Sequence, residues 1–226
     1  MKLRGFSIVP AAAALLLLTG CGGNVSPGTA SVVNGTTITT SQVDELTDAQ
    51  CAGVALAAKT QQAQAGSRKQ VARGALSLLI DTQLNLDFAK SLGLDPNPTS
   101  AAQIYSRVDP LIQALPAKDR PVTERVFHRW ATARDLMTQV GAIATGQTVT
   151  ADNEDTILNA GYQKRQSWLK GVKVRTNPIY GPTKDGFPGG GDGSVSQASS
   201  SFAKSGAAAT EKPTWVADLP ANQRCG

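Results

Sequence analysis

Residues 68–94 read RKQVARGALSLLIDTQLNLDFAKSLGL, and this stretch decides the fold. Small and apolar residues recur in it at steps of three and four, which is the spacing of one helix face: Val71, Ala75, Leu78, Leu79, Thr82, Leu86 and Ala89. Gly93 can take the left-handed conformation that ends a helix, and Leu94 can pack back onto the last turn. Pro96 and Pro98 prevent the helix from continuing. The stretch therefore predicts a long amphipathic helix in a mainly helical domain.

Upstream of this helix, the sequence predicts a short extended element followed by a first helix. Residues 31–39, SVVNGTTIT, place β-branched residues around Asn34 and Gly35, which both tolerate positive φ and favour a turn. Ser41, with Asp44 three residues later, is typical of a helix N-cap. The apolar positions expected on one face of this helix are Val43, Leu46, Val54 and Ala57.

Downstream, three more helices are expected. Ser100 with Gln103 forms a capping pattern for the third helix, which Pro110 should break or kink. Pro121 suits the first turn of the fourth helix. Residues 151–171, ADNEDTILNAGYQKRQSWLKG, begin with acidic and end with basic side chains, as the helix dipole favours in a fifth helix.

The domain boundaries follow from these elements. A helical bundle of about five helices is expected between residues 41 and 171, within a domain spanning 31–175. The alternating segment VKVRTN, residues 172–177, predicts a second short strand. Residues 176–226 are rich in glycine, serine and proline, which predicts a long irregular tail that cannot order by itself.

The N-terminal segment, residues 1–20, has the features of a secretory signal peptide. It begins with Lys2 and Arg4, and residues 8–18 are apolar apart from Pro10. This apolar stretch is shorter than the ~20 residues that a membrane-spanning helix needs. A basic start, a short apolar core and small residues before a cut are typical of an exported chain.

The end of this segment, Leu18-Thr19-Gly20-Cys21, resembles the bacterial lipobox. The resemblance implies that the thiol of Cys21 receives a diacylglyceryl group and that Cys21 becomes the new N-terminus. We therefore expect a lipoprotein held on the outer, extracytoplasmic face of the cell membrane, since two acyl chains anchor a protein stably. Residues 21–30 would form a flexible tether. A plain signal peptide with an incidental cysteine is the alternative.

Composition restricts the classes of function. Removing Lys2 and Arg4 from the 22 basic side chains leaves 20, against 17 acidic ones, so the net charge is only +3. The sequence contains no basic block with interleaved aromatic residues, so nothing in it indicates a nucleic-acid partner. One histidine and three cysteines offer little for a metal site, and no cofactor motif is present. Alanine is abundant and aromatic residues make up 5%, which favours helices over a β-sandwich.

The motifs with possible chemistry favour structural roles. His128 accompanies a helix stripe with no serine or cysteine nucleophile motif beside it, so we expect it at a helix surface or core edge. The run Gly189–Gly191 lacks the lysine and hydroxyl residue of a phosphate-binding loop. Asp44, Glu45 and Asp48 are expected to complement a helix dipole rather than to bind a cation. We therefore predict no catalytic residue, no metal ligand and no enzymatic activity.

Two cysteines remain once Cys21 is lipidated. Cys51 and Cys225 are an even pair in an exported chain, where thiols tend to be oxidised, so we expect a disulfide. The apolar residues of KPTWVADLPANQRCG, residues 212–226, indicate that the end of the tail docks again. In the chain-entropy description, a disulfide that closes a loop this long stabilises the folded state by at most roughly 5 kcal/mol. The alternative is a buried Cys51 with a free Cys225.

Three segments together resemble the N-terminal chaperone domain of SurA/PrsA-type foldases. The first matches the pattern V-x-V-N-G-x-x-I-(S/T) at Val33, Asn34, Gly35, Ile38 and Thr39. The second helix of the family is matched at Leu79, Ile80, Leu84, Ala89 and Gly93. The family's closing V-x-V-N-P-R-Y/F-G is similar to VKVRTNPIYG, residues 172–181. The resemblance also implies that the first and last of these segments lie together, with the fifth helix packed against the first two.

The resemblance implies a chaperone module without the isomerase that PrsA carries. A parvulin domain needs on the order of a hundred residues, and only residues 146–154 separate the fourth and fifth helices. The leading hypothesis is a tethered chaperone-like protein that binds unfolded exported polypeptides through exposed apolar surface. The rival is an adaptor lipoprotein that binds one folded partner of the cell envelope. The sequence leaves open which of the helical aromatic residues face outward: Phe88, Phe127, Trp130, Tyr162 and Trp168.

Overall fold

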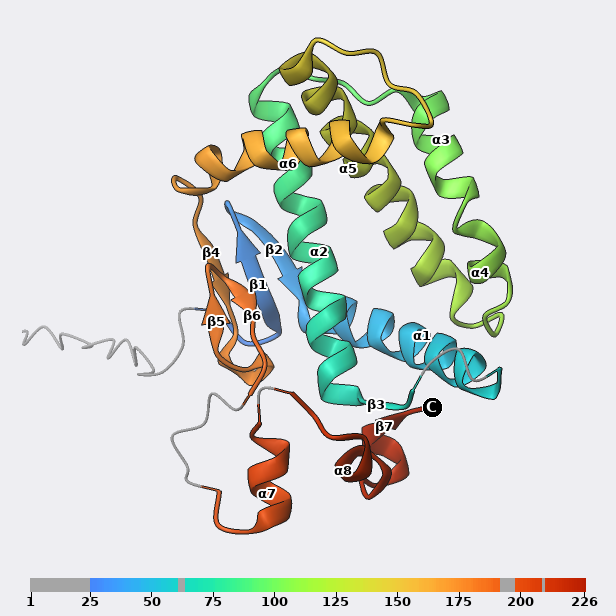
Figure 1. Cartoon of the computed structure of the whole chain (residues 1–226). Coiled ribbons are helices and arrows are strands. Elements are labelled where there is room, and N and C mark those ends of the chain that lie inside the picture. The colour runs from blue at the N-terminus through green and yellow to red at the C-terminus, as the bar shows by residue number, and fades with distance from the viewer. Residues whose placement is uncertain (1–24, 61–63, 192–197, 209) are drawn as a thin grey trace, which may run out of the picture.

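A computed structural model of the chain describes residues 25–60, 64–191, 198–208 and 210–226. The molecule is mainly helical, as the sequence predicts, with most of its short strands at the left in Figure 1. The predicted signal peptide and Cys21 lie outside the described residues, as does part of the predicted tether.

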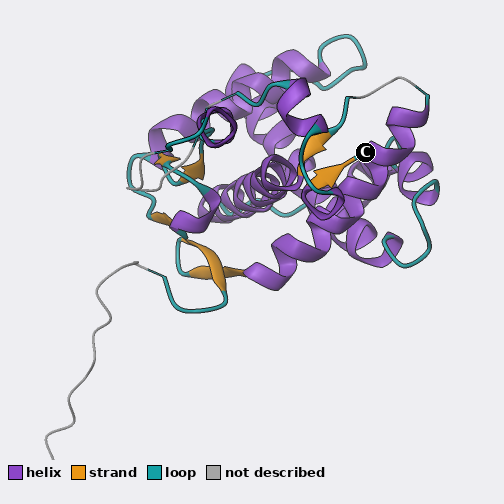
Figure 2. Cartoon of the chain, turned by 90° about the horizontal axis from the view of Figure 1, so that it is seen from below, coloured by secondary structure: helices purple, strands orange, loops and turns teal. Residues whose placement is uncertain are grey.

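The helical domain contains six helices and a small sheet. The helices are α1 (Thr40–Lys59), α2 (Arg68–Ser91), α3 (Pro98–Ser106), α4 (Asp109–Gln113), α5 (Arg120–Thr145) and α6 (Glu154–Leu169). The sheet consists of β1 (Thr29–Val33), β2 (Thr36–Thr39) and β4 (Val174–Thr176). Helix α2 runs through the middle of the molecule, and Figure 2 looks along it from below.

The rest of the chain forms smaller elements. They are β3 (Gly66–Ser67), η1 (Pro178–Tyr180), β5 (Thr183–Lys184), β6 (Phe187–Pro188), α7 (Ser201–Gly206), α8 (Pro213–Ala217), η2 (Ala221–Gln223) and β7 (Arg224–Cys225). Strands β5 and β6 pair with each other, and β7 pairs with β3.

The sheet joins the two ends of the helical domain. Strand β1 pairs antiparallel with β2 through a turn at Asn34 and Gly35, whose φ angles are 48° and 89°. On its other side β1 pairs antiparallel with β4, so that Ser31 lies opposite Thr176. The predicted hairpin and the predicted closeness of the two extended segments are both confirmed.

Both predicted domain boundaries are too narrow. Ala30 is fully buried in β1, so the ordered chain begins before residue 31 and the tether is shorter than 21–30. Beyond residue 175, Tyr180 is buried in the main core. The Arg73 guanidinium of α2 donates hydrogen bonds to the carbonyl oxygens of Tyr180 and Gly191. Side chains from α2 therefore order the first part of the predicted tail, which composition alone could not reveal.

The buried face of α2 agrees with the predicted stripe only in part. Ala75, Thr82 and Ala89 are buried as expected, whereas Val71 and Leu78 are only half-buried. Outside the predicted stripe, Leu76, Ile80 and Leu84 are fully buried in the main core. Leucine or isoleucine occupies several faces of this helix, so more than one stripe fits the helical period. The elements that pack around α2 decide which stripe becomes the core.

The starts of α1 and α3 are shifted from the predicted residues, whereas the predicted stop of α2 is confirmed. Thr39, with Gln42, forms the capping box of α1 in place of Ser41. Asn97 caps α3 in place of Ser100. Gly93 ends α2 with a φ of 69°, and the Leu94 amide donates to the Ala89 carbonyl. The break expected from Pro110 is present at the α3–α4 junction, and Pro121 lies in the first turn of α5 as predicted.

Helix α6 packs mainly along α5, not against the first two helices as expected. Gly141 of α5 and Gly161 of α6 allow this contact, because a Cβ at either position would overlap a backbone carbonyl of the other helix. Helix α6 also touches α2, where the buried Arg165 binds Asp81 at 2.7 Å and also contacts Asn85. The axes can approach so closely only because neither glycine carries a side chain.

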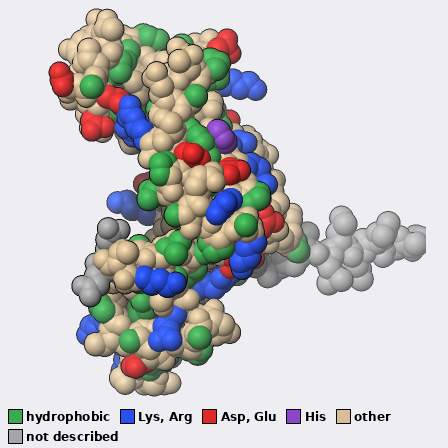
Figure 3. Space-filling model, turned by 90° about the vertical axis from the view of Figure 1, so that its right-hand side faces the viewer, with side chains coloured by type: hydrophobic (Ala, Val, Ile, Leu, Met, Phe, Trp, Pro, Cys, Tyr) green, Lys and Arg blue, Asp and Glu red, His purple; other side chains and the backbone are tan. Residues whose placement is uncertain are grey.

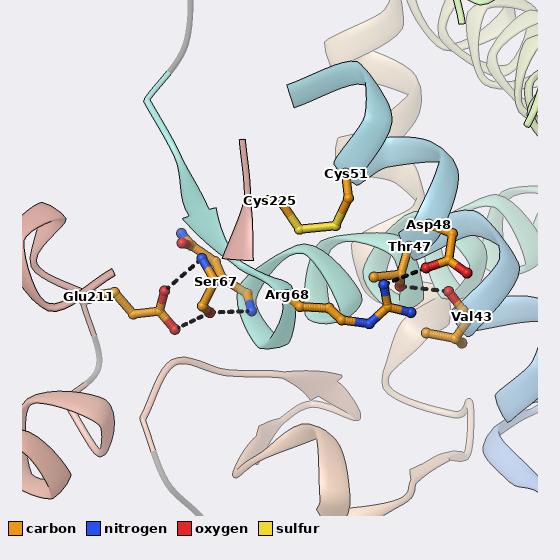
Figure 4. The surroundings of a disulfide bond; sticks show 9 residues. Val43, Thr47, Asp48, Cys51, Ser67, Arg68, Glu211 and Cys225 are labelled. Carbon is orange, nitrogen blue, oxygen red and sulfur yellow. Dashed lines mark hydrogen bonds and ion pairs between the residues drawn. A yellow bond between two sulfur atoms is a disulfide. The ribbon is translucent and has the colours of Figure 1, made fainter. Parts of the chain in front are cut away.

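The end of the chain is fastened beside α1. A disulfide joins Cys51 to Cys225 with a Cα–Cα distance of 4.6 Å, across a sequence separation of 174 (Figure 4). This is the pairing that the cysteine count favours. In the same region the Ser67 hydroxyl donates to the Glu211 carboxylate at 2.6 Å. The last part of the tail is therefore held at two points.

Candidate functional site

The best-formed candidate site is an apolar groove with a volume of about 640 Å³. It lies between the second half of α1, the first turns of α2, the α4 region and the start of α5. Figure 3 looks onto the side of the molecule that carries α4 and the end of α1. The lining residues are Ala49, Gln50, Gly53, Val54, Leu56, Ala57, Thr60, Val71, Gly74, Val108, Leu111, Ile112, Ala114, Leu115, Thr123 and Phe127.

The second half of α1 forms one wall. The first half of this helix alternates fully buried residues, such as Val43 and Leu46, with exposed ones. Residues 51–58, CAGVALAA, are instead all half-buried. These residues carry no charge and only small or apolar side chains, so the helix has no polar face there. This wall is apolar surface that the domain leaves partly uncovered.

The opposite wall comes from α4 and the turn that follows it. Ile112 and Leu115 are buried beneath this wall, whereas Leu111, which directly precedes Ile112, is 72% exposed at the rim. Leu115 lies close to Gly53, where an added Cβ would come within 3.6 Å of its Cδ2 atom. An added Cβ would make only an ordinary van der Waals contact there, so the two walls lie close together without requiring the glycine.

The structure shows which predicted aromatic residue lines the groove. Phe127 is half-buried there, and its ring lies 5.7 Å from that of Trp130 in an edge-on arrangement. Phe88 is buried, with its ring 5.4 Å from that of Trp168, in the core between α2, α5 and α6. Tyr162 packs against that same core. Of the five helical aromatic residues, Phe127 is the one that the groove uses.

The groove has almost no electrostatic character. Within the described chain, no residue that lines the groove is charged. The polar side chains of the lining are Gln50, Thr60 and Thr123. Two acidic residues of α1 form ion pairs outside the groove. Glu45 pairs with Arg125 at 3.3 Å, and Asp48 pairs with Arg68. The described residues contain no group of three histidine, cysteine or acidic side chains placed to hold a metal ion.

The remaining sequence candidates have structural surroundings. His128 is exposed on α5, and its ring stacks on Tyr105 with centroids 3.6 Å apart. In the glycine run, the Gly189 amide donates to the Pro182 carbonyl at 2.7 Å. Gly191 accepts from Arg73. The run thus makes ordinary backbone contacts with the domain.

Sequence reasoning missed the groove itself. Val54 and Ala57 were expected in the core stripe of the first helix, yet both line the groove. The available signal was the uncharged run at residues 51–58, which lacks the polar face of an ordinary surface helix. A site of this volume, within the ~300–1,000 Å³ of typical ligand pockets, can hold a few apolar side chains. The groove can bury apolar groups, and its described lining provides no charged side chain for catalysis.

Two results concern the chain as a whole. Among the described residues, no helix combines the length and the apolar character that crossing a membrane requires. No family model matches this chain, and neither a curated protein nor a solved structure matches it.

Proposed function

We propose that this protein is an extracytoplasmic, membrane-tethered chaperone-like lipoprotein that binds unfolded exported polypeptides. The observation that carries the proposal is the open groove lined by uncharged, mostly apolar residues. Exposed apolar patches of this kind mark binding sites on soluble domains. Lipid on Cys21 would hold the domain at the outer face of the membrane, where exported chains emerge.

The lining also supports a broad range of clients. Polar groups and charges with a fixed direction let a site select one partner from similar ones. The described lining of the groove has few polar side chains and no charged one. The hydrophobic effect that remains depends on buried area and not on sequence. Weak binding of many apolar segments follows from such a surface.

The resemblance to SurA/PrsA-type foldases is independent support. It predicts that the hairpin containing Asn34 and the segment beginning at Val172 lie together, and β1 does pair with β4. Its other expectation, a last helix packed against the first two, is not met, because α6 packs mainly along α5. The proposed module lacks an isomerase, so it would act by holding clients and not by catalysis. An adaptor lipoprotein remains the rival, and it would bind one folded partner.

The test is suppression of aggregation by the unlipidated mature chain, measured by light scattering with several unrelated unfolded proteins. A chaperone should act on most of them at near-stoichiometric ratios, and an adaptor on none. Leu111→Asp should raise the amount of protein needed at least threefold, because it places a charge at the groove rim. Inactivity of the wild type toward every client would reject the proposal.

A matched control is available on α5. Ile143 is 70% exposed, almost the same as Leu111 at 72%, but it does not line the groove. Both substitutions should change stability by no more than about 0.5 kcal/mol, since neither side chain is packed. Ile143→Asp should leave suppression unchanged. Equal losses in the two variants would show that general surface hydrophobicity, not the groove, is responsible.

A further inference from the structure

The charges of this chain are unevenly distributed. Although the sequence has 17 acidic side chains, none falls between residues 156 and 184. The same segment contains six basic residues: Lys164, Arg165, Lys170, Lys173, Arg175 and Lys184. It covers most of α6, all of β4 and the turn that leads to β5.

One of these six has a structural role. Arg165 is 7% exposed and is paired with Asp81. The other five side chains are exposed, and in the described part of the chain none of them forms an ion pair. Four of the five line two adjoining hollows, and we call these four the basic face: Lys170, Lys173, Arg175 and Lys184. Their charges are free to act on a partner.

Part of the basic face is ordered by the sheet. Lys173 and Arg175 are two residues apart along an extended segment, so their side chains point to the same side. Arg175 lies opposite Val32 of β1. Lys170, Lys173 and Arg175 line a hollow of about 850 Å³, into which Asp185 brings the one carboxylate.

An exposed apolar side chain accompanies these charges. Ile179 is 66% exposed in the turn η1, between Arg175 and Lys184 in the sequence. The Asn177 side chain fixes this turn by accepting from the Ile179 amide at 3.1 Å, and Tyr180 is buried next to it. The isoleucine is thus held outward by a turn that is anchored in the core.

The same turn lies where the N-terminal segment joins the domain. The Asn177 amide donates to the Ala30 carbonyl at 2.8 Å, and its Nδ2 donates to the Thr29 carbonyl at 3.1 Å. From Cys21 to Thr29 the chain can reach at most about 28 Å when fully extended. A lipid on Cys21 would keep this side of the domain close to the bilayer, which raises the effective concentration of a weak membrane contact.

We propose that the basic face and Ile179 form a membrane-docking surface whose partner is the anionic lipid headgroups of the bilayer. The inference rests on the proposed lipid anchor. Clustered lysine and arginine residues attract anionic membrane surfaces within roughly a Debye length of ~8–10 Å, and an apolar side chain adds interfacial burial. In Figure 1, β4 and β5 lie on the left and α4 on the right, so docking would turn the groove away from the bilayer.

The test is binding of the unlipidated mature chain, made as Cys21→Ser, to vesicles by co-sedimentation. Vesicles contain phosphatidylcholine alone or with 30 mol% phosphatidylglycerol. Binding should require the anionic lipid, and Lys173→Glu with Arg175→Glu should lower the partition coefficient at least tenfold. Ile179→Ser should lower it about threefold without changing the salt dependence. No effect of Ile179→Ser would overturn the role of the isoleucine.

A charge-matched control separates a surface from net charge. Lys118 and Lys204 are exposed and lie outside the basic face, so Lys118→Glu with Lys204→Glu makes the same change in total charge. This control pair should stay within twofold of the parent. Equal losses in the two pairs, or binding without anionic lipid, would overturn the docking surface. Aggregation suppression by the parent is measured separately, so failure of docking and failure of the chaperone proposal are distinguishable.

Discussion

The crossing of α5 and α6 and the groove beside α1 both contain glycine, yet their glycines have opposite surroundings. At Gly141 and Gly161, a Cβ would overlap the backbone of the facing helix. At Gly74, which lines the groove, nothing lies within 4 Å of an added Cβ. The glycines allow close contact between α5 and α6, whereas Gly74 leaves open space at the groove. The difference shows that small-residue content does not by itself indicate close packing.

The two regions are also held together by different means. The α5–α6 contact depends on packing between backbones and on the core beneath them. The second half of α1 is half-buried along its length, and the bond between Cys51 and Cys225 fastens it to the end of the chain. Gly226 lies beside Val54, a groove residue. A covalent bond thus stabilises a part of the domain in which the helix is only half-buried.

The largest expected effect comes from removing the disulfide. Replacing both Cys51 and Cys225 by alanine should lower the free energy of unfolding by about 2–5 kcal/mol, the usual range for such a loss. Hydrogen exchange should increase mainly in the second half of α1 and in β7, while α5 and α6 stay protected. Uniform loss of protection would contradict the division into two regions. Peptide mapping without reduction, with free thiol recovered at both positions of the native protein, would contradict the bond itself.

The next effect concerns the glycine crossing. Gly161→Ala should destabilise the domain by about 1–3 kcal/mol, because the helices must separate to admit the methyl group. Gly74→Ala is the matched control, since it adds the same group to an exposed helical position. It should be neutral or stabilise by up to about 1 kcal/mol through higher helix propensity. Chemical denaturation measures both, and similar changes in the two variants would remove the distinction.

The smallest effect is a pH dependence in the main core, where Tyr180 is buried. Burial, with a contribution from the Asp44 carboxylate, raises the pKa of Tyr180 to about 12. An unfolded tyrosine titrates near ~10, so this side chain favours the folded state fully below that pH. The contribution is lost between about pH 10 and pH 12, since the unfolded state ionises first. Denaturation midpoints should therefore fall more steeply above pH 10 in the wild type than in Tyr180→Phe. The same pH dependence of the midpoint in the two proteins would show that the Tyr180 hydroxyl is not buried in the core.

Local signals predicted much of the fold. The turn at Asn34 and Gly35, the stop at Gly93 and the helix start at Pro121 depend on backbone conformations that few residues allow, so the sequence specifies them directly. The start of α1 was misplaced by two residues because Ser41 and Thr39 are both good caps. Choosing between them depends on where β2 ends, and that is set by pairing with β1.

The candidate site was less predictable. An apolar helix face looks the same in sequence whether a neighbour covers it or not, so Val54 and Leu46 were assigned to one stripe. Their different burial depends on how far α4 lies from α1 in space. The pair Cys51 and Cys225 did indicate where the C-terminal end returns, because a covalent pair gives a distance constraint that periodicity cannot.

The bond between Cys51 and Cys225 turns most of the chain into one covalent ring. A protease that cuts any single peptide bond between these two residues opens the ring but releases no fragment. Both pieces remain attached to α1, and through it to whatever holds the N-terminal segment. Damage of this kind changes the mass of the polypeptide by only one water until the disulfide is reduced. A lipid-held domain with such a ring would stay at its membrane after a first cut.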